Sequence, residues 1–280
     1  MESLLTKIAK SEKGTGKPLV CLHGYGGSVL HWEAVTREWT AHFRVIVPNL
    51  THLYMGTQKL SFSQQIDQVA AFLREMSPHE PVSLVGISYG GALAWGLALQ
   101  YPELIDKVIF INPMPPFAAK SFGIPSLRAF FALPIPVTLV HFFLSSGAGR
   151  RFLRDAGAVF RNLQGEPVED RIEHLRGRKL KFVSHIFWKF SWILRTERWA
   201  QWEQRLTGWK HDCLLVYDRK DPLFNSDFYD GFAKKLAGTN VVVTQEAGHI
   251  SILQQPKLIG GTVREYLLRD YYQVAEGFGG

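Results

Sequence analysis

Short apolar runs typical of β-strands alternate with helix-like runs along most of this 280-residue chain. Strands are expected at about residues 17–24, 44–50, 81–87, 107–113, 211–217 and 240–244, and an earlier strand at 3–10 is expected to end in a turn at 11–16. Helices are expected between them at 28–40, 61–76, 89–100 and 226–238, with a last helix at 257–270. Because a helix between two strands returns the chain for parallel pairing, this alternation predicts an α/β fold with a mostly parallel central sheet flanked by helices.

The alternation stops after Pro113 and resumes near residue 211. This interruption predicts that residues 1–114 and 207–280 form one core and that residues 115–206 form an inserted helical lid. Part of the insertion, residues 129–149, is apolar enough to suggest a membrane span. Pro134 and Pro136 interrupt that run, so we favour apolar lid helices over a spanning helix.

The net charge of +7 is unevenly distributed along the chain. Residues 148–210 carry 14 Lys/Arg and 7 Asp/Glu, which accounts for the whole excess, so the rest of the chain is neutral. A basic segment inside the lid predicts peripheral contact with an anionic membrane. No nucleic-acid partner is expected, because acidic residues at 166, 169, 170 and 173 interrupt the basic charge and no known binding motif accompanies it.

Two further features bear on the compartment. Cys21 and Cys213 each lie in an apolar, strand-like run, where buried free thiols are expected, and no disulfide framework is predicted. The first residues lack the apolar core of a secretory signal. Both features predict a cytoplasmic protein.

A G-x-S-x-G pattern, formed by Gly86, Ser88 and Gly90, follows one expected strand and opens the next expected helix. In that context the serine is expected on a tight strand-to-helix turn, with its hydroxyl projecting from the edge of the sheet and a helix N-terminus beneath it. The alternative is that Ser88 only caps the helix. We favour a nucleophile.

A serine nucleophile needs a base, and the base needs a carboxylate to orient it. Of ten histidines, His249 is favoured, because it lies in a glycine-containing loop just after the last expected strand. Asp221 follows the preceding strand and is the favoured carboxylate, since Pro222 fixes the loop after it. Asp218, nearer the strand end, remains the alternative.

The remaining requirement is a pair of amide donors for an oxyanion. The glycine-rich "LHGYGG", residues 22–27, ends a strand, so its amides can turn toward the serine. The backbone N–H groups of Tyr25 and Tyr89 are therefore predicted to form the oxyanion hole.

With "LHGYGG", "GISYGG", "DRKDPLF" and "AGHISILQQP" in this order, the chain resembles the lid-bearing serine hydrolases of the α/β-hydrolase superfamily from about residue 4 to 269. The resemblance implies a Ser88–Asp221–His249 triad, no cofactor or metal, and a lid over the site. Two features depart from the family pattern: residues 48–62, "PNLTHLYMGTQKLSF", stand where the family usually has an Asp- and Gly-rich loop, and Asp218 stands where glycine is common. A serine nucleophile argues against the dehalogenases and epoxide hydrolases of this fold.

Aromatic residues concentrate in the lid and bear on the substrate. Trp188, Trp192, Trp199 and Trp202 recur at helical spacing, which predicts an aromatic face that packs on the core, lines an acyl pocket or rests on a membrane. Trp188, Trp192 and Phe142 are predicted pocket residues, and the substrate is expected to be a lipophilic carboxylic ester. Thioester or C–C cleavage by the same triad and a non-catalytic ligand-binding protein remain alternatives.

Overall fold

The computed structural model describes residues 10–55, 59–116, 125–149, 151 and 180–277. Within these residues a seven-stranded sheet has the order β1-β3-β2-β4-β5-β6-β7, and every neighbouring pair is parallel except β1 with β3. The strands are β1 (Lys10–Lys13), β2 (Lys17–Leu22), β3 (Phe43–Pro48), β4 (Val82–Ile87), β5 (Ile105–Ile111), β6 (Asp212–Asp218) and β7 (Asn240–Thr244). This sheet confirms the predicted α/β class.

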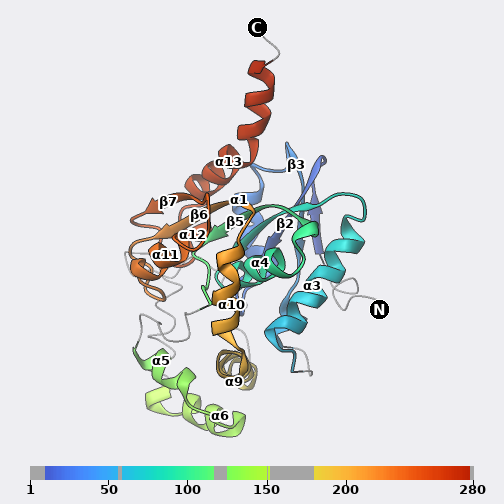
Figure 1. Ribbon diagram of the computed structural model, residues 1–280. Helices are drawn as coiled ribbons and strands as arrows, with labels where there is room; N and C mark the ends of the chain where they lie inside the picture. The colour runs from blue at the N-terminus through green and yellow to red at the C-terminus, as the bar shows by residue number, and fades with distance from the viewer. Residues whose placement is uncertain (1–9, 56–58, 117–124, 150, 152–179, 278–280) are drawn as a thin grey trace.

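Helices cover both faces of the sheet (Figure 1). They are η1 (Val29–Trp32), α1 (Glu33–Thr36), α2 (Thr51–Met55), α3 (Phe62–Met76), α4 (Tyr89–Gln100), η2 (Pro102–Leu104), α11 (Ser226–Ala233), α12 (Ser251–Gln254) and α13 (Pro256–Gly277). Successive strand residues point to opposite faces. Leu84 and Phe110 accordingly lie in the core cluster that includes α3 and α4, whereas Val85 and Ile109 lie in the cluster that includes α1 and α13.

One strand prediction was wrong in part. Residues 11–13 were expected in a turn, but Lys10–Lys13 is β1, the edge strand, and it pairs antiparallel with β3. Lys13 is opposite Val45 in this register, so the backbone hydrogen bonds of a buried strand decide the conformation of a polar segment. The expected strand at 3–10 falls almost wholly outside the described residues.

The chain between β5 and β6 contains α5 (Pro125–Ala132), α6 (Val137–Ser145), α9 (Leu180–Thr196), α10 (Trp199–Arg205) and η6 (Leu206–Gly208). Pro134 and Pro136 fall between α5 and α6, where the sequence indicated a break. Among the described residues, no helix has both the length and the apolar character needed to cross a membrane. The division into a core and a lid at 115 and 206 stays a prediction.

The tryptophan-rich stretch is divided between two helices, although its spacing suggested one face. α9 ends at Thr196 and α10 begins at Trp199. The Glu197 carboxylate lies at this break, accepting hydrogen bonds from Trp202 Nε1 (3.0 Å) and from the Phe62 backbone N–H (3.1 Å). It therefore ties the start of α10 to the start of α3.

Candidate active site

Ser88 occupies a sharp turn between β4 and α4, with φ 54° and ψ −121°. Few non-glycine residues adopt a positive φ, and such strain concentrates at functional sites. The flanking glycines allow the turn, because a Cβ on Gly90 would lie 2.0 Å from the Leu22 carbonyl oxygen and one on Gly86 would lie 2.5 Å from the Gly90 oxygen. Ser88 is the N-cap of α4 but makes no side-chain capping hydrogen bond, so its hydroxyl is available to another partner.

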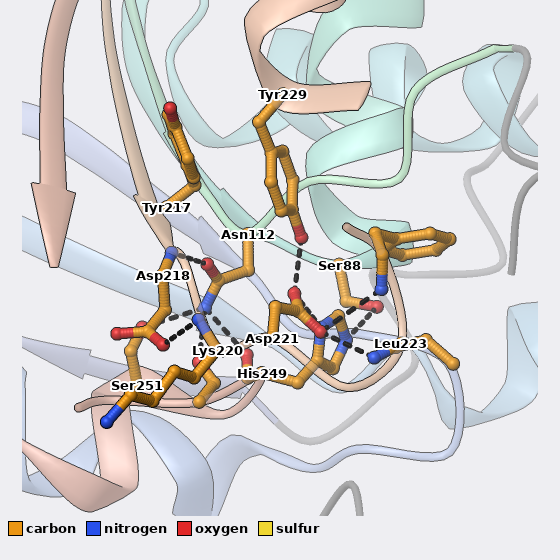
Figure 2. A network of polar contacts seen from close by, with 12 residues as sticks. Ser88, Asn112, Tyr217, Asp218, Lys220, Asp221, Leu223, Tyr229, His249 and Ser251 are labelled. Carbon is orange, nitrogen blue, oxygen red and sulfur yellow. Dashed lines mark hydrogen bonds and ion pairs between the residues drawn. The ribbon is translucent and has the colours of Figure 1, made fainter. Parts of the chain in front are cut away.

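That partner is His249, in the loop after β7. Its Nε2 lies 2.9 Å from Ser88 Oγ, and its Nδ1 lies 2.8 Å from Asp221 Oδ2 (Figure 2). An ionised carboxylate can only accept a hydrogen bond, so Nδ1 carries the proton and its N–H donates a hydrogen bond to Asp221 Oδ2. In the neutral ring, Nε2 is then the acceptor for the Ser88 hydroxyl. The structure thus brings together the three residues that the sequence singled out.

The carboxylate of Asp221 is buried and accepts hydrogen bonds at both of its oxygens. Oδ1 accepts the backbone N–H groups of Leu223 (2.7 Å) and Phe224 (3.2 Å). Oδ2 accepts the Tyr229 hydroxyl in addition to His249. Tyr229, on α11, is fully buried, and burial together with the Asp221 charge raises its pKa well above the usual value. The phenol therefore stays protonated as a donor. Sequence reasoning missed Tyr229, because no motif marks it as a site residue.

Asp218, the alternative acid, has different contacts. It is fully buried, and its Oδ2 accepts Thr244 Oγ1 and the Ala247 N–H, both at 2.7 Å, while Oδ1 accepts the Lys220 N–H (2.8 Å). None of these three hydrogen bonds is to His249. Asp218 therefore joins the end of β6 to the loop that carries the histidine.

Asn112, directly after β5, completes this anchor (Figure 2). Its side-chain amide group donates to the carbonyl oxygens of Gly248 (2.9 Å) and His249 (2.8 Å), and its Oδ1 accepts the Asp218 N–H (2.9 Å). Asn112 is fully buried and has a positive φ of 41°. The sequence reasoning missed it, although a polar residue at the end of the apolar strand "KVIFI" was an available signal.

The predicted oxyanion residues lie beside the nucleophile. β2 and β4 are neighbours in the sheet, so the loop after β2 meets the turn after β4. A Cβ on Gly24 would lie 3.1 Å from Ser88 Cβ, and the rings of Tyr25 and Tyr89 are 5.2 Å apart between centroids. Tyr89 begins α4, whose N-terminus favours negative charge. Their role as amide donors stays a prediction.

The surroundings of the serine are aromatic. Phe190 of α9 lies 4.6 Å from Tyr25 and 5.7 Å from Tyr89 between ring centroids, and Tyr54 stacks on Tyr25 at 4.9 Å. Burial raises the pKa of the Tyr25, Tyr54 and Tyr89 hydroxyls well above the usual value. These phenols therefore remain neutral. The rings of Tyr54 and Tyr89 are buried in the large core cluster, and Tyr25 and Phe190 pack against it.

The three predicted pocket residues lie in different settings. Trp188 and Trp192 are half-buried and pack against the large core cluster, with Lys59 Nζ 4.5 Å from the Trp188 ring centroid. Phe142 is 75% exposed on α6, which corrects its assignment to a pocket. Its helix buries Val140 and Leu144 instead, and the apolar sequence of α6 did not reveal which face is inward.

Comparison with known proteins supports this picture. A family model described as the alpha/beta hydrolase fold matches residues 17–256. A pimeloyl-[acyl-carrier protein] methyl ester esterase of Vibrio vulnificus is 30% identical over 116 residues, or 41% of this chain and 44% of that protein, so the match spans less than half of either. A 2-hydroxymuconate semialdehyde hydrolase of Pseudomonas sp. is 24% identical over 270 residues, or 91% of this chain and 88% of that protein.

A solved structure extends the likeness to the fold. A thermophilic esterase from Thermogutta terrifontis superposes with a TM-score of 0.71 at 19% identity, covering 96% of this chain and 97% of that one. The family model covers most of the chain, from β2 to the start of α13, and includes Ser88, Asp221 and His249. The chain therefore belongs to the α/β-hydrolase fold family.

Proposed function

We propose that this protein is a serine hydrolase that cleaves the carboxylic ester of a lipophilic acyl group. The observation that carries the proposal is the continuous hydrogen-bonded series from Ser88 through His249 to Asp221, with contacts of 2.9 and 2.8 Å. Membership of a hydrolase family supports the same class of activity. No cofactor or metal has a part in the proposed reaction.

In the proposed mechanism, His249 Nε2 removes the proton of Ser88 Oγ as the oxygen attacks the ester carbonyl. Asp221 holds the imidazole in the required tautomer and stabilises the imidazolium that forms. The amides of Tyr25 and Tyr89 bind the oxyanion, and the imidazolium then protonates the leaving alkoxide. Water, activated by His249, releases the acid from the acyl-enzyme and restores Ser88.

The aromatic surroundings support a lipophilic acyl group. Tyr25, Tyr89 and Phe190 meet next to the nucleophile, and Phe224 lies 5.7 Å from the His249 ring. Burying an acyl chain against such rings is favourable by roughly 0.8 kcal/mol for each methylene removed from water. Thioester and C–C cleavage use the same three residues, so a panel of esters, thioesters and diketones separates these reactions.

A fluorophosphonate probe tests the nucleophile directly. We expect labelling of the wild type and none of Ser88→Ala, since the probe reacts with an activated serine. Ser83→Ala is the matched control, because Ser83 lies on β4, five residues before Ser88, and bonds Asp106 Oδ2 instead of His249. Labelling that persists in Ser88→Ala would overturn the assignment of Ser88 as the nucleophile. If neither the wild type nor any variant is labelled, a non-catalytic ligand-binding protein is favoured.

A further inference from the structure

The most exposed large apolar side chains of the described residues gather on one helical hairpin. Leu133, Leu139 and Phe142 are 53%, 56% and 75% exposed, the three highest values among the six exposed large hydrophobics. All three lie on α6 or in its connection to α5, at the opposite end of the molecule from the end of α13 (Figure 1). Together with the exposed Arg128 of α5, we name them the α5–α6 face.

The α5–α6 face is distinct from the inward side of the hairpin. Leu139 and Phe142 are three residues apart on α6 and project from the same side of the helix. The opposite side buries Val140 and Leu144, while α5 buries Phe130 and Phe131. The hairpin therefore already has its core contacts, and the exposed face is an additional apolar surface of the kind that marks an interaction site.

The charge of this region fits an anionic partner. No Asp or Glu occurs between Asp106 and Asp155, a stretch that contains six Lys or Arg residues. Of these basic residues, Arg128 and Arg151 are exposed. An apolar surface that has arginines and no carboxylate among its described residues suits the interface of a bilayer with anionic headgroups, where the apolar side chains insert and the arginines stay at the headgroups.

Aromatic packing connects the hairpin to the nucleophile. Phe131 of α5 lies 5.2 Å from Phe190 of α9, and Phe190 lies 4.6 Å from Tyr25. Tyr25 in turn contacts Tyr89, the residue after Ser88. A continuous set of aromatic side chains thus runs from α5 to the candidate site.

We propose that the α5–α6 face docks the protein on an anionic lipid bilayer. Leu139 and Phe142 insert into the interface and Arg128 binds lipid phosphates. The docked protein would take its acyl ester from the bilayer, and this part of the proposal rests on the proposed hydrolase function. The docking itself requires no catalysis.

Vesicle sedimentation of Ser88→Ala protein tests docking without turnover. Vesicles of phosphatidylcholine alone are compared with vesicles that contain about 30% phosphatidylglycerol at about 0.1 M salt. We expect binding to the anionic vesicles, and we expect Leu139→Ser with Phe142→Ser to lower the partition coefficient by about tenfold or more. Val241→Ser with Leu258→Ser is the matched control, since these residues are also exposed, at 44% and 48%, but lie on β7 and α13.

The charge contribution has its own pair of variants. Arg128→Gln should weaken binding about fivefold, whereas Lys234→Gln, an exposed position after α11, should leave it unchanged. A variant is used only if its thermal unfolding midpoint equals that of the wild type. Because the altered side chains are exposed, all variants should meet this criterion.

Three results would overturn the docking proposal. The first is no binding of the wild type to phosphatidylglycerol vesicles. The second is equal binding by the Leu139/Phe142 variant and its control. The third is self-association that this variant abolishes without any vesicle binding, which would make a second copy the occupant of the face. Failure of the hydrolase proposal appears separately, as absence of Ser88-dependent labelling in detergent-free buffer.

Discussion

Different interactions hold two parts of the molecule. One part is the sheet edge around Ser88, which is formed by the carboxyl ends of the parallel strands, and the other is the set of helices between β5 and β6. At the sheet edge, Asp218, Asp221 and Asn112 each have several hydrogen-bond donors or acceptors at 2.7–3.2 Å. Between α5, α6 and α9, aromatic rings pack on one another, as Phe131 does on Phe187 and Phe190. Directional bonds fix individual atoms, whereas ring packing fixes a surface and tolerates more variation.

This contrast suggests a division of labour. The hydrogen-bonded edge holds the atoms that would do the chemistry, and the aromatic helices present the surface that would select the substrate. Substitutions at the edge should therefore alter kcat or folding stability, whereas substitutions in the helices should alter KM and substrate preference.

The largest expected effect is that of Asp221→Asn. An amide at this position favours the wrong imidazole tautomer, so kcat should fall by about 10⁴-fold. Asp218→Asn is the matched control, because the Asp218 carboxylate bonds Lys220, Thr244 and Ala247 rather than His249, and kcat of this variant should fall by no more than about tenfold. Steady-state hydrolysis of a short ester measures both. The reverse order would make Asp218 the triad acid.

The next effect is on stability. Asn112→Ala should lower the free energy of unfolding by about 3 kcal/mol, because it leaves the Gly248 and His249 carbonyls and the Asp218 N–H buried without their partner. Denaturant titration measures the change. Asn240→Ala, at an exposed position on β7, should shift it by less than about 0.5 kcal/mol. Equal effects would show that the Asn112 contacts do not stabilise the edge.

High pH should destabilise the fold. The pKa values of Tyr25, Tyr54, Tyr89 and Tyr229 are raised by burial, so above about pH 10 the unfolded chain loses these protons before the native protein does. The unfolded state then binds fewer protons, and stability falls by about 1.4 kcal/mol per pH unit for each such tyrosine. Denaturant titrations at several pH values test this, and Tyr89→Phe should make the slope shallower. A slope that Tyr89→Phe leaves unchanged would show that this buried tyrosine does not cause the loss of stability at high pH.

Within the aromatic helices, Phe190→Ala should affect binding more than chemistry. Removing the ring beside Tyr25 and Tyr89 should raise KM for long-chain p-nitrophenyl esters about tenfold and leave turnover of the acetate unchanged. Phe142→Ala is the control, since that side chain is exposed and should not alter hydrolysis of dissolved esters. A parallel loss on acetate would mean that Phe190 also supports the geometry of the site.

The smallest expected effect comes from Tyr229→Phe. Without this hydroxyl, Asp221 Oδ2 loses one donor and the carboxylate is held less firmly against His249 Nδ1. The kcat for a short ester should therefore fall by about threefold with KM unchanged. A purely structural role would lower the free energy of unfolding and leave kcat in place, so kinetics measured beside a denaturant titration decide whether Tyr229 positions the acid.

The site residues that the sequence identified are next to local sequence features that determine the backbone conformation. Ser88 lies between glycines that the turn requires, and His249 and Asp221 follow strands recognisable from their apolar runs. Asn112 and Tyr229 had no such motif, because their importance depends on which distant residues they meet. Asn112 bonds residues 136 and 137 positions away, a pairing that only the order of strands creates.

The sequence by itself determined the parallel sheet, the nucleophile turn and the break between α5 and α6, because strand periodicity, glycine sterics and proline geometry are local properties. Only the tertiary structure decided that Asp218 anchors the histidine loop while Asp221 bonds the histidine, since Asp218 ends β6 and Asp221 lies only three residues after it. It also decided that Phe142 faces outward, because an apolar helix has no sequence signal for its buried side until its neighbours are in place.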